Sequence, residues 1–195
     1  MFPPPSPLTN PLQREGRRSS RDSSKQSSLA LRAPYGRQNH PLFHPNGKAR
    51  CILVDSEPKV IARTLKQQQD GEDSGGGDGK FQRLNALSEQ HGRGNNWALG
   101  YYGPRMSEGK EGSLLSRTLE CLRREAERCD SFEGCFLWSS LCGGTGSGLG
   151  SRLVAEIRSE YPRRCLLSAT MAPFRRGELP LQHYNAILAS AVHQW

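Results

Sequence analysis

The chain has 195 residues, enough for one domain with a sizeable core. Only 34% of the residues are hydrophobic and the mean hydropathy is −0.69, so part of the chain is expected to be unpacked. The net charge is +8, but residues 1–50 carry nine Lys/Arg against two Asp/Glu, and the remainder carries 18 against 17. The basic charge therefore belongs to the N-terminal segment, which argues against a nucleic-acid-binding domain.

The six cysteines form no Cys-x-x-Cys pair, and no Cys/His spacing matches a zinc site. Their scatter through apolar runs predicts buried thiols in a reducing compartment. No apolar stretch approaches the roughly 20 residues that span a bilayer, and no apolar core of a secretory signal is present. The N-terminal segment is rich in Arg and Ser, as organelle transit peptides are, but five early prolines interrupt any amphipathic helix there.

Residues 1–48 are predicted to form a disordered tail, because Pro, Ser, Arg and Gln dominate them and apolar residues are sparse. Within this tail His40 and His44 have helical ligand spacing, but Pro41 opposes a helix, so we expect solvated histidines. A packed domain is predicted over residues 50–195. Residues 70–79, rich in glycine and acids, are predicted to be a flexible loop inside it.

The packed part alternates predicted strands with predicted helices. Strands are expected at 51–54, 135–141 and 165–170, and helices at 59–68, 113–128, 147–161 and from Tyr184 onward. The clearest helix is 113–128, because its apolar residues recur at three- and four-residue steps on one face: Leu115, Leu119, Leu122 and Ala126. Residues 92–100 are expected to be a glycine-punctuated loop. The alternation predicts an α/β fold with a parallel sheet and helices on both faces.

The run Cys142–Gly150 reads Cys-Gly-Gly-Thr-Gly-Ser-Gly-Leu-Gly and lies between a predicted strand and a predicted helix. This placement puts it at the carboxyl end of a parallel strand, where open α/β sheets bind ligands. Glycines let backbone amides approach an anion, and Thr145 and Ser147 add hydroxyl donors. The positive end of the following helix points to the same place. The pattern therefore predicts a site for an anion such as a nucleotide phosphate.

Three better-known glycine motifs do not match this run. A P-loop needs Lys and Ser/Thr after the last glycine, but Leu149 follows Gly148. The dinucleotide fingerprint fails because Ser151 stands where its third glycine should be. A nucleophile elbow fails because Thr145 and Leu149 flank Ser147 at the required distance. A loop that turns the chain without a ligand remains the alternative.

Four segments resemble the tubulin family, and they follow one another along the chain in the same order as in that family. Gly143–Gly148 is similar to the tubulin glycine loop, and Ile52–Pro58 is similar to a strand and acidic loop near the metal and the γ-phosphate. Gly94–Gly100 resembles the Asn-Asn-Trp/Tyr-Ala loop, and Tyr184–Leu188 resembles the Tyr-Asn-Ala segment. Bacterial FtsZ-type proteins share the glycine loop, but the other segments favour tubulin. From about Cys51 to Trp195 the details are most like δ-tubulin.

This resemblance implies an incomplete Rossmann-like GTPase-type domain that binds GTP or GDP with Mg²⁺. The positions that match the family's phosphate contacts are Gly143, Gly144, Thr145, Gly146, Ser147, Gly148 and Asn95. Asp55 and Glu57 match the acidic pair that lies near the nucleotide and holds Mg²⁺ through water. Glu178 falls where the family places an acid on the ribose. The alternative to a metal site at Asp55 and Glu57 is an ordinary polar end of a strand. The resemblance implies no catalytic residue in this chain.

The chain also departs from the family pattern. Cys142 replaces a small Ala, Gly or Ser, and no segment resembles the first strand and its Gly-Gln-Cys-Gly-Asn-Gln loop. The central helix with the base contacts is not found, and neither is the loop whose acid activates water on the neighbouring subunit's nucleotide. These departures predict weak or no GTP binding, and they leave GTPase activity open.

The resemblance implies a cytoskeletal GTP-binding protein of the cytoplasm that acts in centriole, basal-body and ciliary microtubules. Other tubulins and microtubules are the partners it implies, and neither a membrane nor nucleic acid is expected. One alternative is a tubulin-binding fragment that does not polymerise, and another is an inert fragment. A third is a nucleic-acid binder acting through residues 1–50.

Overall fold

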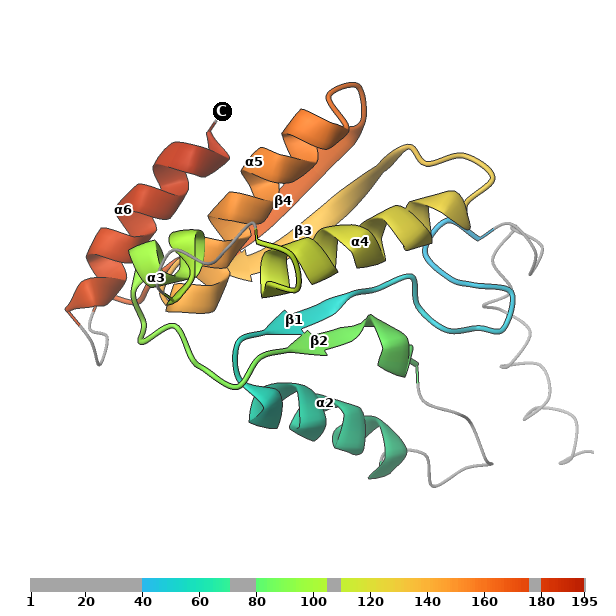
Figure 1. Ribbon diagram of the computed structural model, residues 1–195, viewed down its shortest axis with the longest axis horizontal. Coiled ribbons are helices and arrows are strands. Elements are labelled where there is room, and N and C mark those ends of the chain that lie inside the picture. Colours follow the sequence, from blue (N-terminus) through green and yellow to red (C-terminus); the bar gives the residue numbers. More distant parts are fainter. Residues whose placement is uncertain (1–39, 71–79, 105–109, 176–179, 195) are drawn as a thin grey trace, which may run out of the picture. The chain divides into compact units, whose positions relative to one another are not determined.

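The computed structural model describes residues 40–70, 80–104, 110–175 and 180–194 (Figure 1). The chain divides into Met1–His40 and Pro41–Trp195, and every element below belongs to the second unit. Residues 1–39 of the predicted tail and residues 71–79 of the predicted flexible loop lie outside the described residues. No helix in the described ranges is both long enough and apolar enough to cross a bilayer.

Strands and helices alternate along the described chain, which confirms the α/β class. In order, the elements are β1 (Leu53–Asp55), α2 (Pro58–Asp70), η1 (Arg83–Asn85), β2 (Ala86–Ser88), α3 (Trp97–Tyr102), α4 (Leu114–Glu127), β3 (Gly134–Ser140), η3 (Gly144–Leu149), α5 (Gly150–Glu160), β4 (Cys165–Met171) and α6 (Leu181–His193). The predicted strands and helices are all present, with ends shifted by a few residues.

The strands form two separate parallel pairs among the described residues, where one parallel sheet was predicted. In the first pair Val54 of β1 lies opposite Leu87 of β2, and in the second Phe136 of β3 lies opposite Leu167 of β4. Parallel neighbours require a crossover connection, and α2 and α5 supply one to each pair.

Helices cover both faces of the first strand pair. Figure 1 shows α2 and α4 on opposite sides of β1 and β2, and the contacts agree, since α2 packs on both strands and α4 on β2. The second pair differs, because α5 packs on one face only. On its other face Phe136, Trp138, Leu167 and Met171 remain between 56% and 71% exposed.

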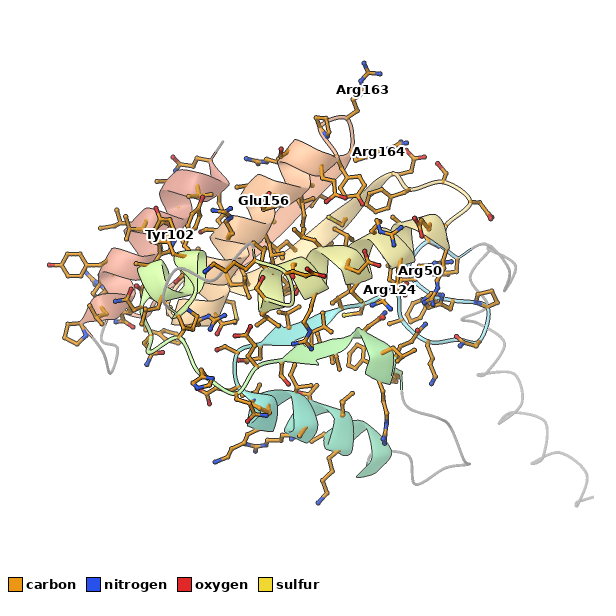
Figure 2. All side chains as sticks on the ribbon, viewed as in Figure 1. Arg50, Tyr102, Arg124, Glu156, Arg163 and Arg164 are labelled. Atoms are coloured by element: carbon orange, nitrogen blue, oxygen red, sulfur yellow. The ribbon has the colours of Figure 1, made fainter. Side chains whose placement is uncertain are left out.

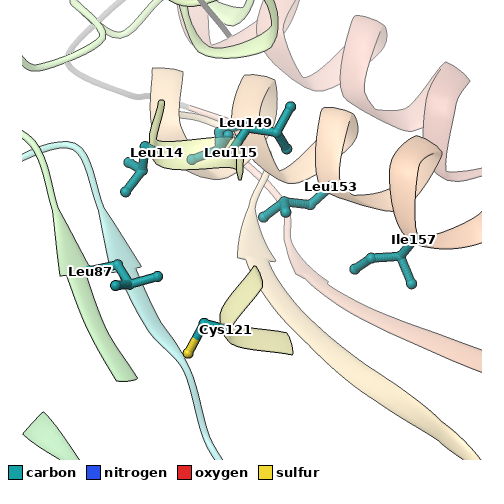
Figure 3. Packing of buried hydrophobic residues seen from close by; sticks show 7 residues of the cluster. All are labelled: Leu87, Leu114, Leu115, Cys121, Leu149, Leu153 and Ile157. Atoms are coloured by element: carbon teal, nitrogen blue, oxygen red, sulfur yellow. The ribbon is translucent and has the colours of Figure 1, made fainter. Parts of the chain in front are cut away.

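β2, α4 and α5 pack against one another through one cluster of buried hydrophobic residues (Figure 3). Its members are Leu87, Leu114, Leu115, Cys121, Leu149, Leu153 and Ile157. Val54 of β1 and Cys135 of β3 pack against the same cluster, so both strand pairs share one helical layer. Leu149, the last residue of η3, is 1% exposed within this cluster, so the core fixes the end of the glycine run.

Three short elements were not predicted as such: η1, β2 and α3. β2 has only the three residues Ala-Leu-Ser, and without β-branched or aromatic residues it carries no strand signal. The predicted loop 92–100 becomes helical at Trp97, where α3 begins. Asn96 caps this helix, since its side-chain oxygen accepts hydrogen bonds from the amides of Ala98 and Leu99 at 2.8 and 3.3 Å.

The most buried face of α4 is shifted by one residue from the predicted apolar face. It includes Glu125, which is 6% exposed. His44 lies 2.9 Å from one oxygen of this carboxylate, and Asn85 and Arg128 donate to the other at 3.1 and 2.9 Å. Such partners make a buried carboxylate tolerable. The prediction that His44 is solvated is therefore wrong, because His44 is only 8% exposed.

The basic turn between α5 and β4 lies at the opposite end of α5 from the glycine run. Figure 2 shows Arg163 and Arg164 projecting from this turn. Arg164 is 3.9 Å from the Glu133 carboxylate, and both side chains are well exposed, so this pair adds little to stability.

Candidate functional site

The glycine run forms the start of one long helical segment. β3 ends at Ser140, the π-helical turn η3 begins at Gly144, and α5 continues it to Glu160. The first turn of such a segment leaves backbone amides without intrahelical acceptors. These amides belong to Gly144, Thr145 and Gly146, at the positive end of the helix dipole. The glycine run therefore stands at a helix start, as the predicted anion site requires.

Most glycines of the run are required by packing inside the protein. A β-carbon at Gly144 would lie 2.6 Å from the Arg93 β-carbon, and one at Gly146 would lie 2.6 Å from the Ser140 carbonyl oxygen. At Gly143 the nearest atom outside the adjacent residues would be the Asn95 side-chain oxygen, 3.8 Å away. Gly143 therefore has room for an added atom, whereas the sequence alone assigned every glycine to the approach of a phosphate.

Helix α3 lies directly on η3 because both present a glycine at the contact. A β-carbon at Gly148 would lie 2.2 Å from the Trp97 carbonyl oxygen, and one at Gly100 would lie 2.0 Å from the Gly144 carbonyl oxygen. Such distances are far below van der Waals contact. This packing brings the segment that follows Asn95 against the glycine run.

The two hydroxyls of the run have different surroundings. Ser147 is fully buried and donates to the carbonyl of Gly143, so in this structure it does not offer the donor that was predicted. Thr145 is half-buried, and its hydroxyl oxygen lies 2.6 Å from that of Ser56. Ser56 was missed by sequence reasoning, although its position between two candidate acids was a usable signal.

The acidic pair lies at the end of β1, next to the glycine run. Asp55 is half-buried and accepts the Glu57 amide at 3.0 Å, and Glu57 is exposed just before α2. The contact between Ser56 and Thr145 brings this segment to the loop. No cluster of three metal-ligating side chains occurs within the described ranges. Because Mg²⁺ binds through one or two carboxylates plus phosphate oxygens and water, two carboxylates fit a metal that a nucleotide helps to hold.

Asn95 has a backbone φ of +49°, the left-handed region that asparagine tolerates better than most residues. Asn185 of α6 holds this backbone in place and was missed as a site residue. Its amide donates to the carbonyls of Asn95 and Cys142, each at 2.7 Å, and its oxygen accepts the Trp97 amide at 2.9 Å. One buried side chain thus joins three segments, and the Tyr-Asn-Ala motif was the signal for it.

The structure therefore brings together the glycine run, Asn95 and the segment Asp55–Glu57. These parts come from three loops that follow β1, β2 and β3, which matches the general location of ligand sites in α/β folds. Glu178, the predicted ribose contact, lies outside the described residues.

Known proteins resemble this chain over most of its length. Residues 23–193 match the model of the Tubulin/FtsZ family, GTPase domain. The chain is 37% identical over 142 residues to the tubulin delta chains of Macaca fascicularis and Homo sapiens, which covers 72% of this chain and 28% of each relative. It is 37% identical over 175 residues to the tubulin beta-1 chain of Colletotrichum gloeosporioides, covering 89% of this chain and 35% of the relative.

The chain thus spans about a third or less of the length of these relatives. The match to the family model covers most of the chain and contains every described site residue named above. With parallel α/β units, a glycine run at a helix start and this match, the chain belongs to the Tubulin/FtsZ family.

Proposed function

We propose that the chain binds the phosphates of a guanine nucleotide, GTP or GDP, at the start of η3. One observation carries the proposal: the helix start at Gly144, the Thr145 hydroxyl and the Asn95 loop meet at one place. Unpaired amides at a helix N-terminus favour an anion, and the family model is that of a GTPase domain.

Each part of the site has a role in this proposal. The amides of Gly144 to Gly146 and the Thr145 hydroxyl donate to phosphate oxygens, while Asn95 and Gly143 lie beside each other next to them. Asp55 and Glu57 hold Mg²⁺ through water, and the metal lowers the repulsion between carboxylates and phosphates. Glu178 contacts the ribose. Ser147 and Gly148 support the loop from inside.

Titration calorimetry of the chain with GTP and Mg²⁺ tests the proposal. The departures from the family pattern predict weak GTP binding or none, and the proposed site requires weak binding, with a Kd between about 1 µM and 1 mM. Asp55→Asn should weaken GTP binding when Mg²⁺ is present, and in EDTA it should leave binding unchanged or strengthen it slightly, because it removes a carboxylate that repels the phosphates. Sub-micromolar affinity would contradict the expected weakness. No heat of binding at millimolar GTP would refute the nucleotide site itself.

At the level of the cell, we propose that the chain acts with other tubulins in microtubules of centrioles, basal bodies or cilia. The similarity to tubulin delta chains supports this role. A fluorescently tagged chain should colocalise with a centriolar marker, and diffuse fluorescence without centriolar enrichment would contradict the assignment.

A second candidate is a tubulin-binding module that does not polymerise. The exposed apolar face of β3 and β4 favours it, because apolar patches rimmed by polar residues mark interaction sites. Co-sedimentation with preformed microtubules tests this candidate. Pelleting that Trp138→Thr abolishes would support it, whereas equal amounts of chain in the pellet with and without microtubules would exclude it.

A further inference from the structure

Ser56 is a polar residue in a fully buried position at the end of β1. It is 1% exposed, and its hydroxyl oxygen lies 2.6 Å from that of Thr145, 89 positions later in the chain. Of the two neighbouring residues, Asp55 accepts the Glu57 amide with its carboxylate, a bond within the same segment. The Ser56 side chain is therefore the direct polar link between the end of β1 and the glycine run.

The glycine run has only one hydroxyl left for a ligand. Ser147 is buried and donates to the carbonyl of Gly143, which occupies its single hydrogen. Thr145 is half-buried, so its side chain borders the space where an anion would lie. What Ser56 does to Thr145 therefore decides how well this hydroxyl can donate.

The direction of the hydrogen bond between the two hydroxyls is not fixed by geometry, since either oxygen can be the donor. Each hydroxyl has one hydrogen and can accept as well. An anion at the loop accepts the Thr145 hydrogen, and Ser56 must then donate to Thr145. The result is a chain of hydrogen bonds from Ser56 through Thr145 to the anion, in which each bond polarises the next.

We infer that Ser56 is a positioning residue for the phosphate site: it fixes the Thr145 side chain and directs its hydrogen toward the bound phosphate. The inference rests on the proposed function, since it requires phosphate at this loop. Ser56 itself need not touch the ligand, because it acts through Thr145.

A double-mutant cycle on the full chain tests the inference. The variants are Ser56→Ala, Thr145→Val and the two combined, and the ligands are GTP with Mg²⁺ and inorganic tripolyphosphate. Loss of one hydrogen bond of about 1 kcal/mol corresponds to about fivefold in affinity. We expect Ser56→Ala to weaken binding of both ligands by about fivefold in the native background and to have no further effect beside Thr145→Val.

Rescue and a matched control separate positioning from a general loss of stability. Ser56→Cys retains a weak donor and should recover part of the affinity. Thr118→Val removes a buried hydroxyl that donates to the Leu114 carbonyl at 2.6 Å within α4, and it should leave affinity unchanged. Urea unfolding shows that each variant is folded under the binding conditions.

The outcomes distinguish the inference from the function on which it rests. If the native chain binds neither GTP nor tripolyphosphate, both fail. If the native chain binds but Ser56→Ala binds equally well, the inference alone fails. An equal loss for Ser56→Ala with and without Thr145→Val also overturns it, because Ser56 would then act independently of Thr145.

Discussion

At the scale of single residues, Asn185 makes the most specific contribution to the site. Its amide group reaches two carbonyls and one backbone amide from two segments, Asn95–Trp97 and Cys142, and joins both to α6; the residue is 3% exposed. An amide suits this position because it offers both donors and an acceptor. A carboxylate would supply only acceptors and would face the carbonyls of Asn95 and Cys142.

Replacement of Asn185 therefore tests how the loops are held. We expect Asn185→Asp to lower the free energy of unfolding by about 2–4 kcal/mol, since it leaves buried carbonyls without donors beside a charge. Urea denaturation measures the change. Asn46→Ala is the matched control, because Asn46 accepts the Lys48 amide in an exposed turn, and it should cost far less. Equal effects of the two changes would contradict the role of Asn185.

The thiols provide a second prediction for single residues. Burial raises the pKa of Cys51, Cys121 and Cys135, whereas Cys165 is exposed. Cys121 is buried and Cys51 and Cys135 are half-buried. Because the thiolate is the reactive form, these three thiols carry less of it at a given pH. Iodoacetamide at pH 8 should modify Cys165 first, as peptide mass spectrometry over time would show. Modification of Cys121 at a similar rate in the folded chain would contradict the packing of α4.

At the scale of elements, the contact of α3 with η3 depends on two facing glycines. Gly148→Ala would place a β-carbon 2.2 Å from the Trp97 carbonyl oxygen, which forces the two helices apart. We expect a loss of about 1–3 kcal/mol in the free energy of unfolding, or more if the backbone cannot shift. Gly143→Ala is the control in the same run, because its added β-carbon would lie 3.8 Å from the Asn95 side-chain oxygen, an ordinary contact. If thermal denaturation gave both variants the same Tm, the close contact of α3 with η3 would not be the cause of the lost stability.

At the scale of the whole molecule, the second strand pair has an apolar face that no described element covers. Phe136 and Trp138 of β3 and Leu167 of β4 are each more than half exposed there. Such a patch binds hydrophobic dyes and promotes association. Changing Phe136 and Trp138 to Thr should reduce ANS fluorescence and self-association in sedimentation velocity, since threonine keeps β-propensity. Leu84→Thr changes an exposed leucine of η1 and should have little effect on either measurement.

The sequence by itself determined the order and type of most elements, because the periodic spacing of apolar residues and the glycine punctuation are local properties. The helix at 114–127 follows from its apolar repeat, and the start of a helix at the glycine run follows from its position after an apolar strand. The four ordered motifs also indicated the family, which the match over residues 23–193 confirmed.

Only the tertiary structure decided which polar groups meet. Burial of Glu125 depends on Asn85, which lies 40 positions away, and on His44, which was expected in the tail; only Arg128 is a local partner. The pairing of Ser56 with Thr145 and the bonds of Asn185 likewise join loops separated by 43 to 90 positions. A hydrogen bond forms only when donor and acceptor lie within a few tenths of an ångström of the ideal distance. The packing of α3, α5 and α6 around the glycine run sets these distances, and no local sequence pattern does.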